Sequence, residues 1–344
     1  MDAPIDKYIE LINKYRINPL AEESEPPTYC SINNKPSLTA GNFSLINGKK
    51  KAGKTFLLGG VIASTINNSL QIDKIKGCLP DTKNVVLYFD TEQSQYHANR
   101  SVKRICTLVG NQNPSNLFAF GLRPLSPKER LENIEDTILM TPNVGLVVID
   151  GIRDLLTMGI NDEQEATKLT SLFLKWSYDL NIHIILLLHQ NKNDLNARGH
   201  IGSEVVNKAE TIISVTKEDK GNIFKVVCED SRDIPFDEFG FTIREDGLPI
   251  AAEIPEAKHR KATDPQFIPS EKHLSVLREL YKSTLEYNYA QLTKAISEKF
   301  EIGVNVSKAF VNHYKNKEWL TAERKGMNVN YTLNQGKAQS FFYN

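Results

Sequence analysis

The chain has 344 residues, of which 40% are apolar and 24% charged. This length accommodates one large domain and one small one, and the composition is that of an ordinary globular protein. The 42 lysines and arginines balance 42 aspartates and glutamates. The molecule as a whole therefore presents no strongly basic surface, and net charge gives no support for nucleic-acid binding.

Three further features of the sequence bear on the compartment in which the protein works. The cysteines show no CxxC or Cys/His spacing, which favours free thiols in a reducing compartment over disulfides or zinc. The N-terminus carries acids and an amphipathic period instead of the apolar core of a signal peptide. The longest apolar runs, such as Ile184–Leu188, are far below the roughly 18 residues of a membrane helix. We expect a cytoplasmic protein without a membrane segment.

The first predicted element is a helix over about residues 5–14. A polar stretch with two prolines follows it, so residues 1–40 are predicted as an N-terminal helical arm and linker.

From residue 41 to residue 252 short apolar runs alternate with helical stretches, and this part is predicted as the core. The runs lack period-two alternation, which is typical of parallel strands covered by helices on both faces. The expected strands are FSLIN, NVVLYFD, LFAFG, GLVVID, HIILLLH and TIISVTK. The expected helices span about residues 54–67, 94–109, 127–140 and 163–180. Runs after Thr211 are predicted as antiparallel edge strands joined by tight turns.

The C-terminal part is predicted as a separate domain. A charged, Pro-containing linker over residues 253–269 precedes it. Three helical stretches and two strand-like runs around a basic glycine turn follow in residues 270–344. Three helices and a hairpin indicate a winged-helix domain.

The strongest motif is GKKKAGKT, from Gly48 to Thr55, a complete G-x-x-x-x-G-K-[ST] match after a strand and before an apolar helix. Backbone N–H groups of such a loop converge on phosphates, and the helix points its positive end at them. Lys54 is expected to reach the β- and γ-phosphates and Thr55 to ligate Mg²⁺. The alternative is a Gly/Lys turn without a ligand. The predicted nucleotide-binding residues are Gly48, Lys49, Lys50, Lys51, Ala52, Gly53, Lys54, Thr55 and Phe56.

Three polar groups at strand ends can complete a hydrolytic site. Asp150 ends GLVVID, where a Walker B aspartate would contact Mg²⁺ through water. Glu92 follows NVVLYFD and can polarise a water in line with the γ-phosphate; helix capping is its alternative role. Gln190 follows HIILLLH as a candidate γ-phosphate sensor, or as an ordinary strand exit.

The order of these motifs resembles the RecA/DnaB/RadA superfamily over about residues 41–245. More closely, the chain is similar to RepA-type ATPases and hexameric helicases of plasmids and mobile elements, and IDGIRDLL also fits that branch. The fold expected is therefore α/β, a RecA-like P-loop core with antiparallel edge strands and a winged-helix domain. Asp150 precedes Gly151 and not an acid, which argues against AAA+ proteins with an Asp-Glu Walker B end.

This resemblance implies an ATP- and Mg²⁺-dependent enzyme that forms a ring-shaped homo-oligomer, a hexamer, around single-stranded DNA. Arg232 stands where such helicases place an arginine finger, although Asp230 replaces the usual lysine; a salt bridge with a neighbouring aspartate is the alternative. One candidate channel loop, residues 158–165, is acidic. The other, residues 191–203, offers Lys192, Arg198 and His200 for phosphates, or is a solvated surface loop.

The predicted winged helix offers cations for duplex DNA: Lys308 and Lys315 on its third helix, and Arg324 and Lys325 in the wing. Protein docking and a merely solvated basic face are the alternatives.

Three functions follow from these motifs. The first is a DNA-dependent ATPase, a RepA-like replicative helicase or a mobile-element replication or mobilisation ATPase. The second is a nucleotide-switched DNA-binding or scaffold ATPase without unwinding activity. A small-molecule kinase is the third, and the sequence lacks the arginine-rich lid that it would need.

Overall fold

The structure, a computed structural model, describes residues 3–20, 22, 25–189, 199–218, 222–255, 265–325 and 328–334. The chain divides into two compact units, Met1–Ile254 and Pro255–Asn344. This division falls inside the linker predicted over residues 253–269.

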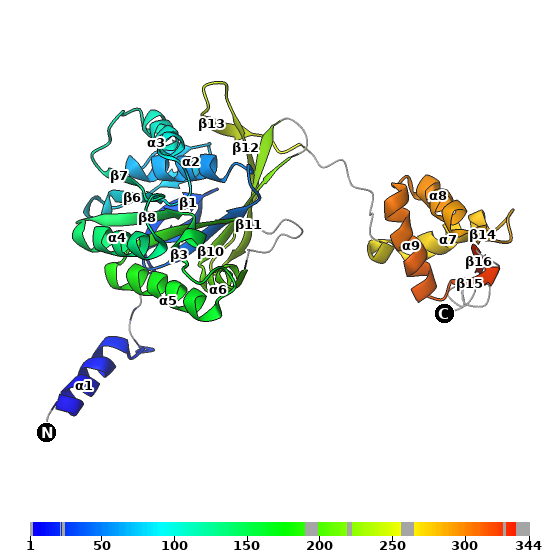
Figure 1. The fold of residues 1–344 in the computed structure, drawn as a ribbon, viewed down its shortest axis with the longest axis horizontal. Helices are drawn as coiled ribbons and strands as arrows, with labels where there is room; N and C mark the ends of the chain where they lie inside the picture. The colour runs from blue at the N-terminus through cyan, green and yellow to red at the C-terminus, as the bar shows by residue number, and fades with distance from the viewer. Residues whose placement is uncertain are drawn as a thin grey trace. The chain divides into compact units, whose positions relative to one another are not determined.

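A mixed sheet forms the centre of the first unit (Figure 1). Its strand order is β13-β12-β11-β10-β3-β9-β8-β6-β7. The strands from β10 to β7 in this order run parallel, and β11, β12 and β13 continue the sheet antiparallel. The carboxyl ends of the parallel strands therefore share one edge, where open α/β sheets bind ligands. The bounds are β3 Phe43–Gly48, β6 Val85–Asp90, β7 Leu117–Gly121, β8 Val144–Asp150, β9 His183–His189, β10 Thr211–Lys217, β11 Ile223–Ser231, β12 Phe239–Ile243 and β13 Pro249–Ala252.

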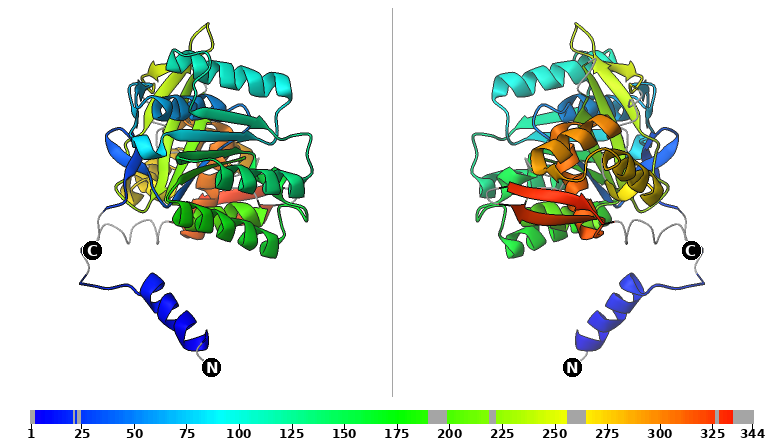
Figure 2. Two further views of the ribbon diagram at one scale, coloured as in Figure 1. Left: turned by 90° about the vertical axis from the view of Figure 1, so that its left-hand side faces the viewer. Right: turned by 90° about the vertical axis from the view of Figure 1, so that its right-hand side faces the viewer.

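Helices cover both faces of this sheet, as the absence of alternation predicted. α2 (Lys54–Ile66) and α3 (Gln95–Val109) pack on one face. α4 (Pro127–Met140), α5 (Glu163–Leu180) and α6 (Gly199–Lys208) pack on the other. The side view in Figure 2 (left) shows α3 and the green helices α4 and α5 on opposite sides of the strands.

Local sequence explains where two of these helices begin. Ser126 accepts a hydrogen bond from the N–H of Glu129, whose carboxylate bonds back to the N–H of Ser126, and Pro127 stands at the first helical position of α4. Asp162 caps α5 in the same way by accepting from the N–H of Glu165 at 2.7 Å. Short 3₁₀ turns occur at η1 (Asp81–Lys83) and η2 (Ile152–Leu155).

The prediction for residues 1–40 was only partly right. α1 spans Ala3–Tyr15, as expected, but the segment predicted as a linker contains β1 (Thr28–Ile32) and β2 (Lys35–Thr39). These strands form a second sheet, β2-β1-β5-β4, with β4 (Leu70–Gln71) and β5 (Ile75–Gly77). Cys30 and Ile32 are fully buried against α2. Residues 28–40 therefore belong to the core.

The second unit contains three helices and a small sheet of order β14-β16-β15 in its described residues. Its hydrophobic core includes Leu277, Ile296, Phe310 and Trp319. The elements are η3 Pro265–Phe267, α7 Ser270–Leu280, β14 Tyr287–Asn288, α8 Tyr289–Phe300, α9 Val304–Asn316, β15 Leu320–Lys325 and β16 Asn328–Leu333. The three helices and the hairpin predicted from the sequence are all present.

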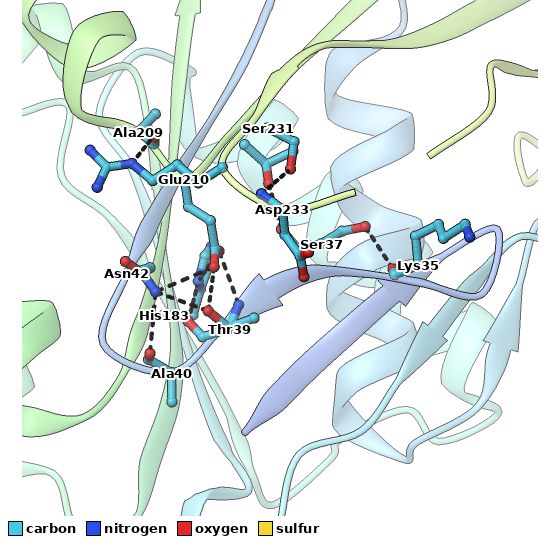
Figure 3. A network of polar contacts seen from close by, with 12 residues as sticks. Lys35, Ser37, Thr39, Ala40, Asn42, His183, Ala209, Glu210, Ser231 and Asp233 are labelled. Carbon is cyan, nitrogen blue, oxygen red and sulfur yellow. Dashed lines mark hydrogen bonds and ion pairs between the residues drawn. The ribbon is translucent and has the colours of Figure 1, made fainter. Parts of the chain in front are cut away.

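A buried polar cluster lies at the amino ends of the core strands, away from the phosphate loop (Figure 3). The Glu210 carboxylate accepts hydrogen bonds from the N–H and hydroxyl of Thr39 and from the Asn42 side chain. Nδ1 of His183 donates to the Thr39 carbonyl at 2.7 Å, and Nε2 has no partner among the described residues. The cluster ties β2 to the starts of β9 and β10.

The buried His183 predicts acid sensitivity of the first unit. Burial lowers its folded-state pKa from 6.5 to about 4. Below pH 6.5 the unfolded chain binds a proton that the folded chain does not, so stability present above this pH is lost as the pH falls. His183 should lower the free energy of unfolding by about 1.4 kcal/mol per pH unit toward pH 4.

Urea titrations from pH 7.5 to 5.5 test this expectation by comparing wild type with His183→Gln. Burial raises the pKa of Glu210, which has the opposite effect on the pH slope, but Glu210 is present in both proteins. The difference in slope therefore isolates His183. Equal slopes would contradict the prediction.

Candidate nucleotide site

The predicted phosphate loop connects β3 to α2 in the strand–loop–helix arrangement that the motif requires. Gly53 has φ +91°, and a Cβ there would lie 2.5 Å from the Phe224 ring. At Gly48 a Cβ would lie 2.4 Å from the Val215 carbonyl oxygen. Neighbouring strands β10 and β11 therefore pack so closely under the loop that only glycine fits at both positions.

Lys54 lies in the first turn of α2 with 7% of its surface exposed. Its Nζ donates to the carbonyls of Gly48 at 2.7 Å and Lys49 at 3.1 Å. Burial lowers the pKa of Lys54 to about 8, while the charges of Asp150 and Glu92 oppose this shift. The ammonium group is thus held at the loop, within electrostatic reach of both predicted carboxylates.

Two aspartates meet at the carboxyl edge of the sheet. Asp90 on β6 is the direct register partner of Asp150 on β8, and the Tyr88 hydroxyl lies 3.4 Å and 3.3 Å from their respective Oδ2 atoms. Burial, followed by the charges of Asp90 and Glu92, raises the pKa of Asp150 to about 7. Carboxylates crowded in this way are suited to a bound cation.

The donor set at this edge fits Mg²⁺ that is shared with a nucleotide. The hydroxyl of Thr55, which stands beside Lys54, is the predicted protein ligand, and the carboxylate of Asp150 is predicted to contact the ion through water. Among the described residues no three His, Cys, Asp or Glu side chains form a metal site by themselves. Mg²⁺ characteristically takes one or two protein ligands and completes its shell with phosphate oxygens and water.

Glu92 stands on a turn that Asp90 fixes. The Asp90 Oδ1 atom accepts from the N–H of Glu92 at 3.1 Å and of Gln93 at 2.8 Å. The Thr91 hydroxyl donates to the carbonyl oxygens of Asp150 and Gly151, which joins this turn to the end of β8. Asp90 therefore stabilises the turn that precedes α3, whose N-cap is Ser94, and the exposed Glu92 side chain remains suited to orienting water.

Arg232 lies away from this chain's own phosphate loop. Its guanidinium donates to the carbonyls of Lys208 at 3.1 Å and Ala209 at 3.3 Å, at the C-terminal end of α6. The backbone N–H of Arg232 donates to the Glu210 carbonyl at 2.9 Å. Among the described residues Arg232 forms no salt bridge with an aspartate, which was the alternative role, and a catalytic role in trans stays a prediction.

The second candidate channel loop is partly helical. α6 begins at Gly199, so residues 199–203 are not a loop, and this part of the prediction was wrong. The N–H of His200 donates to the Ile160 carbonyl at 2.8 Å and its side chain is exposed. Gln190, Lys192 and Arg198 lie outside the described residues.

The candidate DNA-contacting cations of the second unit lie on the expected elements. Lys308 and Lys315 are exposed on α9, and Arg324 is exposed on β15. Lys325 ends β15, and its side chain lies outside the described residues.

Among the described residues no helix is long and apolar enough to cross a lipid bilayer.

Sequence reasoning missed part of the site. Tyr88 bridges the two aspartates, but an aromatic residue inside an apolar strand gave no signal. Asp154 lies 3.4 Å from the Thr91 hydroxyl, and burial together with the Glu92 charge raises its pKa. The sequence signal that could have identified Asp154 is its position four residues after Asp150, just beyond the end of the same strand.

A family of known proteins matches this chain. The model of a family described as AAA domain matches residues 19–194, a little over half of the chain. The match holds although the Walker B strand ends in Asp150-Gly151 and not in Asp-Glu. No curated protein matches the sequence.

Solved structures give distant likenesses. A structure described as an ATPase domain has 16% identity and a TM-score of 0.46, covering 73% of this chain and 98% of its own. The structure of the RadB recombinase has 18% identity and a TM-score of 0.43, and the match covers 63% of this chain and 93% of the recombinase chain. A DnaB-like replicative helicase, from a structure that treats its interactions with primase, has 17% identity and a TM-score of 0.45, covering 74% and 67%.

Proposed function

The chain belongs to the family of AAA domains, and from that premise we propose that it is a DNA-dependent ATPase that works as a ring of identical subunits. It is a RecA-like, ATP-hydrolysing P-loop enzyme that uses ATP and Mg²⁺. The observation that carries the ATPase activity is that Lys54, Asp150 and Glu92 all follow or end strands at the carboxyl edge of the parallel sheet, where their charges interact. DNA dependence and the ring rest on the motif resemblance.

The hydrolytic step follows from these positions. The amides of Gly48–Thr55 and the Lys54 ammonium would bind the triphosphate. Thr55, and Asp150 through water, would hold Mg²⁺, which would supply charge neutralisation at the phosphates. Glu92 orients a water toward the γ-phosphate and accepts its proton. Asp90 and Thr91 keep the Glu92 turn in place. Gln190, the predicted γ-phosphate sensor, follows the strand beside β3.

Ring assembly is proposed from the motif resemblance, with Arg232 as the candidate arginine finger. Because this guanidinium caps α6 and does not face its own phosphate loop, it could act on a nucleotide only in a neighbouring subunit. We propose a hexamer in which Arg232 of one subunit completes the site of the next, as the motif resemblance implies.

DNA contact is proposed at two places in the chain. Lys192, Arg198 and His200 would contact a single strand in the channel. The second unit has the elements of a winged helix, and its exposed Lys308, Lys315 and Arg324 would contact duplex DNA. The RepA-like helicase or mobile-element role rests on the motif resemblance.

A nucleotide-switched DNA-binding or scaffold ATPase remains the second candidate. The acidic segment at residues 158–165 and Asp230 in place of a lysine favour it, because both weaken the resemblance to a translocating motor.

ATP turnover with no DNA, with single-stranded DNA and with duplex DNA separates the two functions. We expect single-stranded DNA to raise turnover several-fold in the wild type, and Lys54→Ala to abolish turnover in every condition. Stimulation by duplex alone would favour the switch. Turnover indifferent to both polynucleotides would contradict DNA dependence while leaving the ATPase intact.

A further inference from the structure

Asp154 is a second acid beside the turn that carries Glu92, and no motif assigns it a role. It lies in η2, four residues after Asp150. A Cβ built on Gly151 would lie 3.4 Å from Oδ2 of Asp154 and 3.6 Å from Cβ of Glu92. The two acidic side chains therefore border the same point at the carboxyl edge of the sheet.

Backbone contacts hold the two acids in this arrangement. Gly151 has φ +109°, and a Cβ there would also lie 2.4 Å from Oγ1 of Thr91. The Thr91 hydroxyl donates to the carbonyls of Asp150 at 3.0 Å and Gly151 at 2.8 Å, and it lies 3.4 Å from Oδ2 of Asp154. Since glycine leaves no side chain between them, the turn after β6 and the turn after β8 pack directly on each other.

The carboxylate of Asp154 has no ion-pair partner among the described residues. The guanidinium of Arg130 on α4 donates instead to three backbone carbonyls, including that of Asp154 at 2.7 Å. Burial, followed by the charge of Glu92, raises the pKa of Asp154, while the charges of Arg130 and Arg153 and the Thr91 hydroxyl oppose this shift. Like charges held together cost stability, so their proximity is consistent with a role in the reaction.

We infer that Asp154 acts through Glu92: its negative charge, held beside the Glu92 turn, strengthens Glu92 as the base for the attacking water. In this step the water oxygen bonds to the γ-phosphorus, the bond from phosphorus to the β–γ bridging oxygen breaks, and the water proton goes to Glu92. A neighbouring negative charge favours the protonated form of a carboxylate and so increases its affinity for that proton. Asp154 is therefore a positioning residue, and the inference rests on the proposed role of Glu92 as the base.

Two other charged groups act on Glu92. Lys54 and Asp150 are both within electrostatic reach of it. Both are predicted to contact the nucleotide or its Mg²⁺, so changing either would alter binding as well as hydrolysis. Asp154 has no such predicted contact, so its charge can be removed while ATP binding is retained.

The pH dependence of kcat, measured on the full chain at saturating Mg²⁺–ATP, tests the inference. Asp154→Asn keeps the size of the side chain and an oxygen that can accept from Thr91, but it removes the charge, whereas Asp154→Ala removes both. Both variants should move the acid limb of the profile about one pH unit toward lower pH and lower kcat at pH 7 about five-fold. ATP binding should stay unchanged. Asp136→Asn, which removes an exposed acid of α4, is the matched control and should leave the profile as in the wild type.

The other outcomes are distinguishable. A wild-type profile in Asp154→Asn, with turnover lost only in Asp154→Ala, would mean that Asp154 merely holds Thr91, and this overturns the inference. Slower turnover without a shift of the acid limb would also overturn it, as would weaker ATP binding in Asp154→Asn. If Glu92→Gln abolishes turnover while the Asp154 variants keep the wild-type acid limb, the inference alone fails. Full turnover in Glu92→Gln would refute the proposed base itself.

Discussion

Replacing Glu92 with glutamine should lower ATP turnover by about a thousand-fold, since a positioned general base contributes roughly 10² to 10⁴ in rate. Glutamine keeps the size of the side chain and can still hydrogen-bond a water, but it cannot accept the proton. The Asp90 and Thr91 contacts that hold the turn use backbone atoms and remain. ATP binding should therefore persist while hydrolysis is lost.

Single-turnover hydrolysis and equilibrium ATP binding, measured on the same preparation, separate these effects. Glu132→Gln is a matched control, because this exposed acid on α4 makes only a surface contact of 3.6 Å with Lys128. It should turn over ATP like the wild type. If Glu92→Gln keeps full turnover, another residue is the base, and the half-buried Asp154, on the turn after β8, becomes the next candidate.

The parts of the site that the sequence predicts are those fixed locally. GKKKAGKT carries its own geometry, since its glycines, lysine and threonine are consecutive and the flanking strand and helix are strongly apolar. Asp150 and Glu92 could be placed because parallel strands bring their carboxyl ends to one edge whatever the register. The structure then adds the register itself, which makes Asp90 the direct partner of Asp150.

The parts that could not be predicted depend on distant partners. β1 and β2 follow a polar, Pro-containing stretch and pair with each other across a short turn, but β1 also needs β5 as its other neighbour, more than 40 residues later in the chain. The burial of Cys30 likewise depends on Ser64 of α2, whose hydroxyl lies 3.9 Å from its sulfur. A single-sequence pattern contains no such information, so residues 28–40 resembled a linker.

Arg232 shows the same limit at a functional position. Its place in the chain suggested an arginine finger, but its contacts with the Lys208 and Ala209 carbonyls depend on α6, which the sequence analysis treated partly as a loop. A finger acting in trans would have to exchange these two carbonyls for phosphate oxygens. The ability of Arg232 to extend toward a neighbouring subunit therefore depends on the C-terminal end of α6 and on Glu210, two residues after Lys208.

Replacing Glu210 with alanine should lower the free energy of unfolding of the first unit by about 3 kcal/mol. The change leaves the N–H and hydroxyl of Thr39 without their acceptor, whereas the amide of Asn42 keeps its bonds to the Thr39 hydroxyl and the Ala40 carbonyl. Each buried donor without a partner costs about 1 to 3 kcal/mol. The loss should stay below their sum, because burial raises the pKa of Glu210 and its removal recovers the cost of desolvating a charge.

Urea unfolding at pH 7 measures this loss, and the two tryptophans allow the first unit to be observed alone. With Trp319→Phe as the background, Trp176 in α5 is the remaining fluorophore. Glu204→Ala is the control, because its surface pair with Lys208 should contribute at most about 1 kcal/mol. An equal, small loss in both variants would mean that water replaces the carboxylate, and that β2 is held to the sheet by the apolar contacts of β1 alone. A large loss of unfolding free energy in Glu210→Ala alone would show that this carboxylate holds the N-terminal strands to the start of β10 and to the segment that carries Arg232.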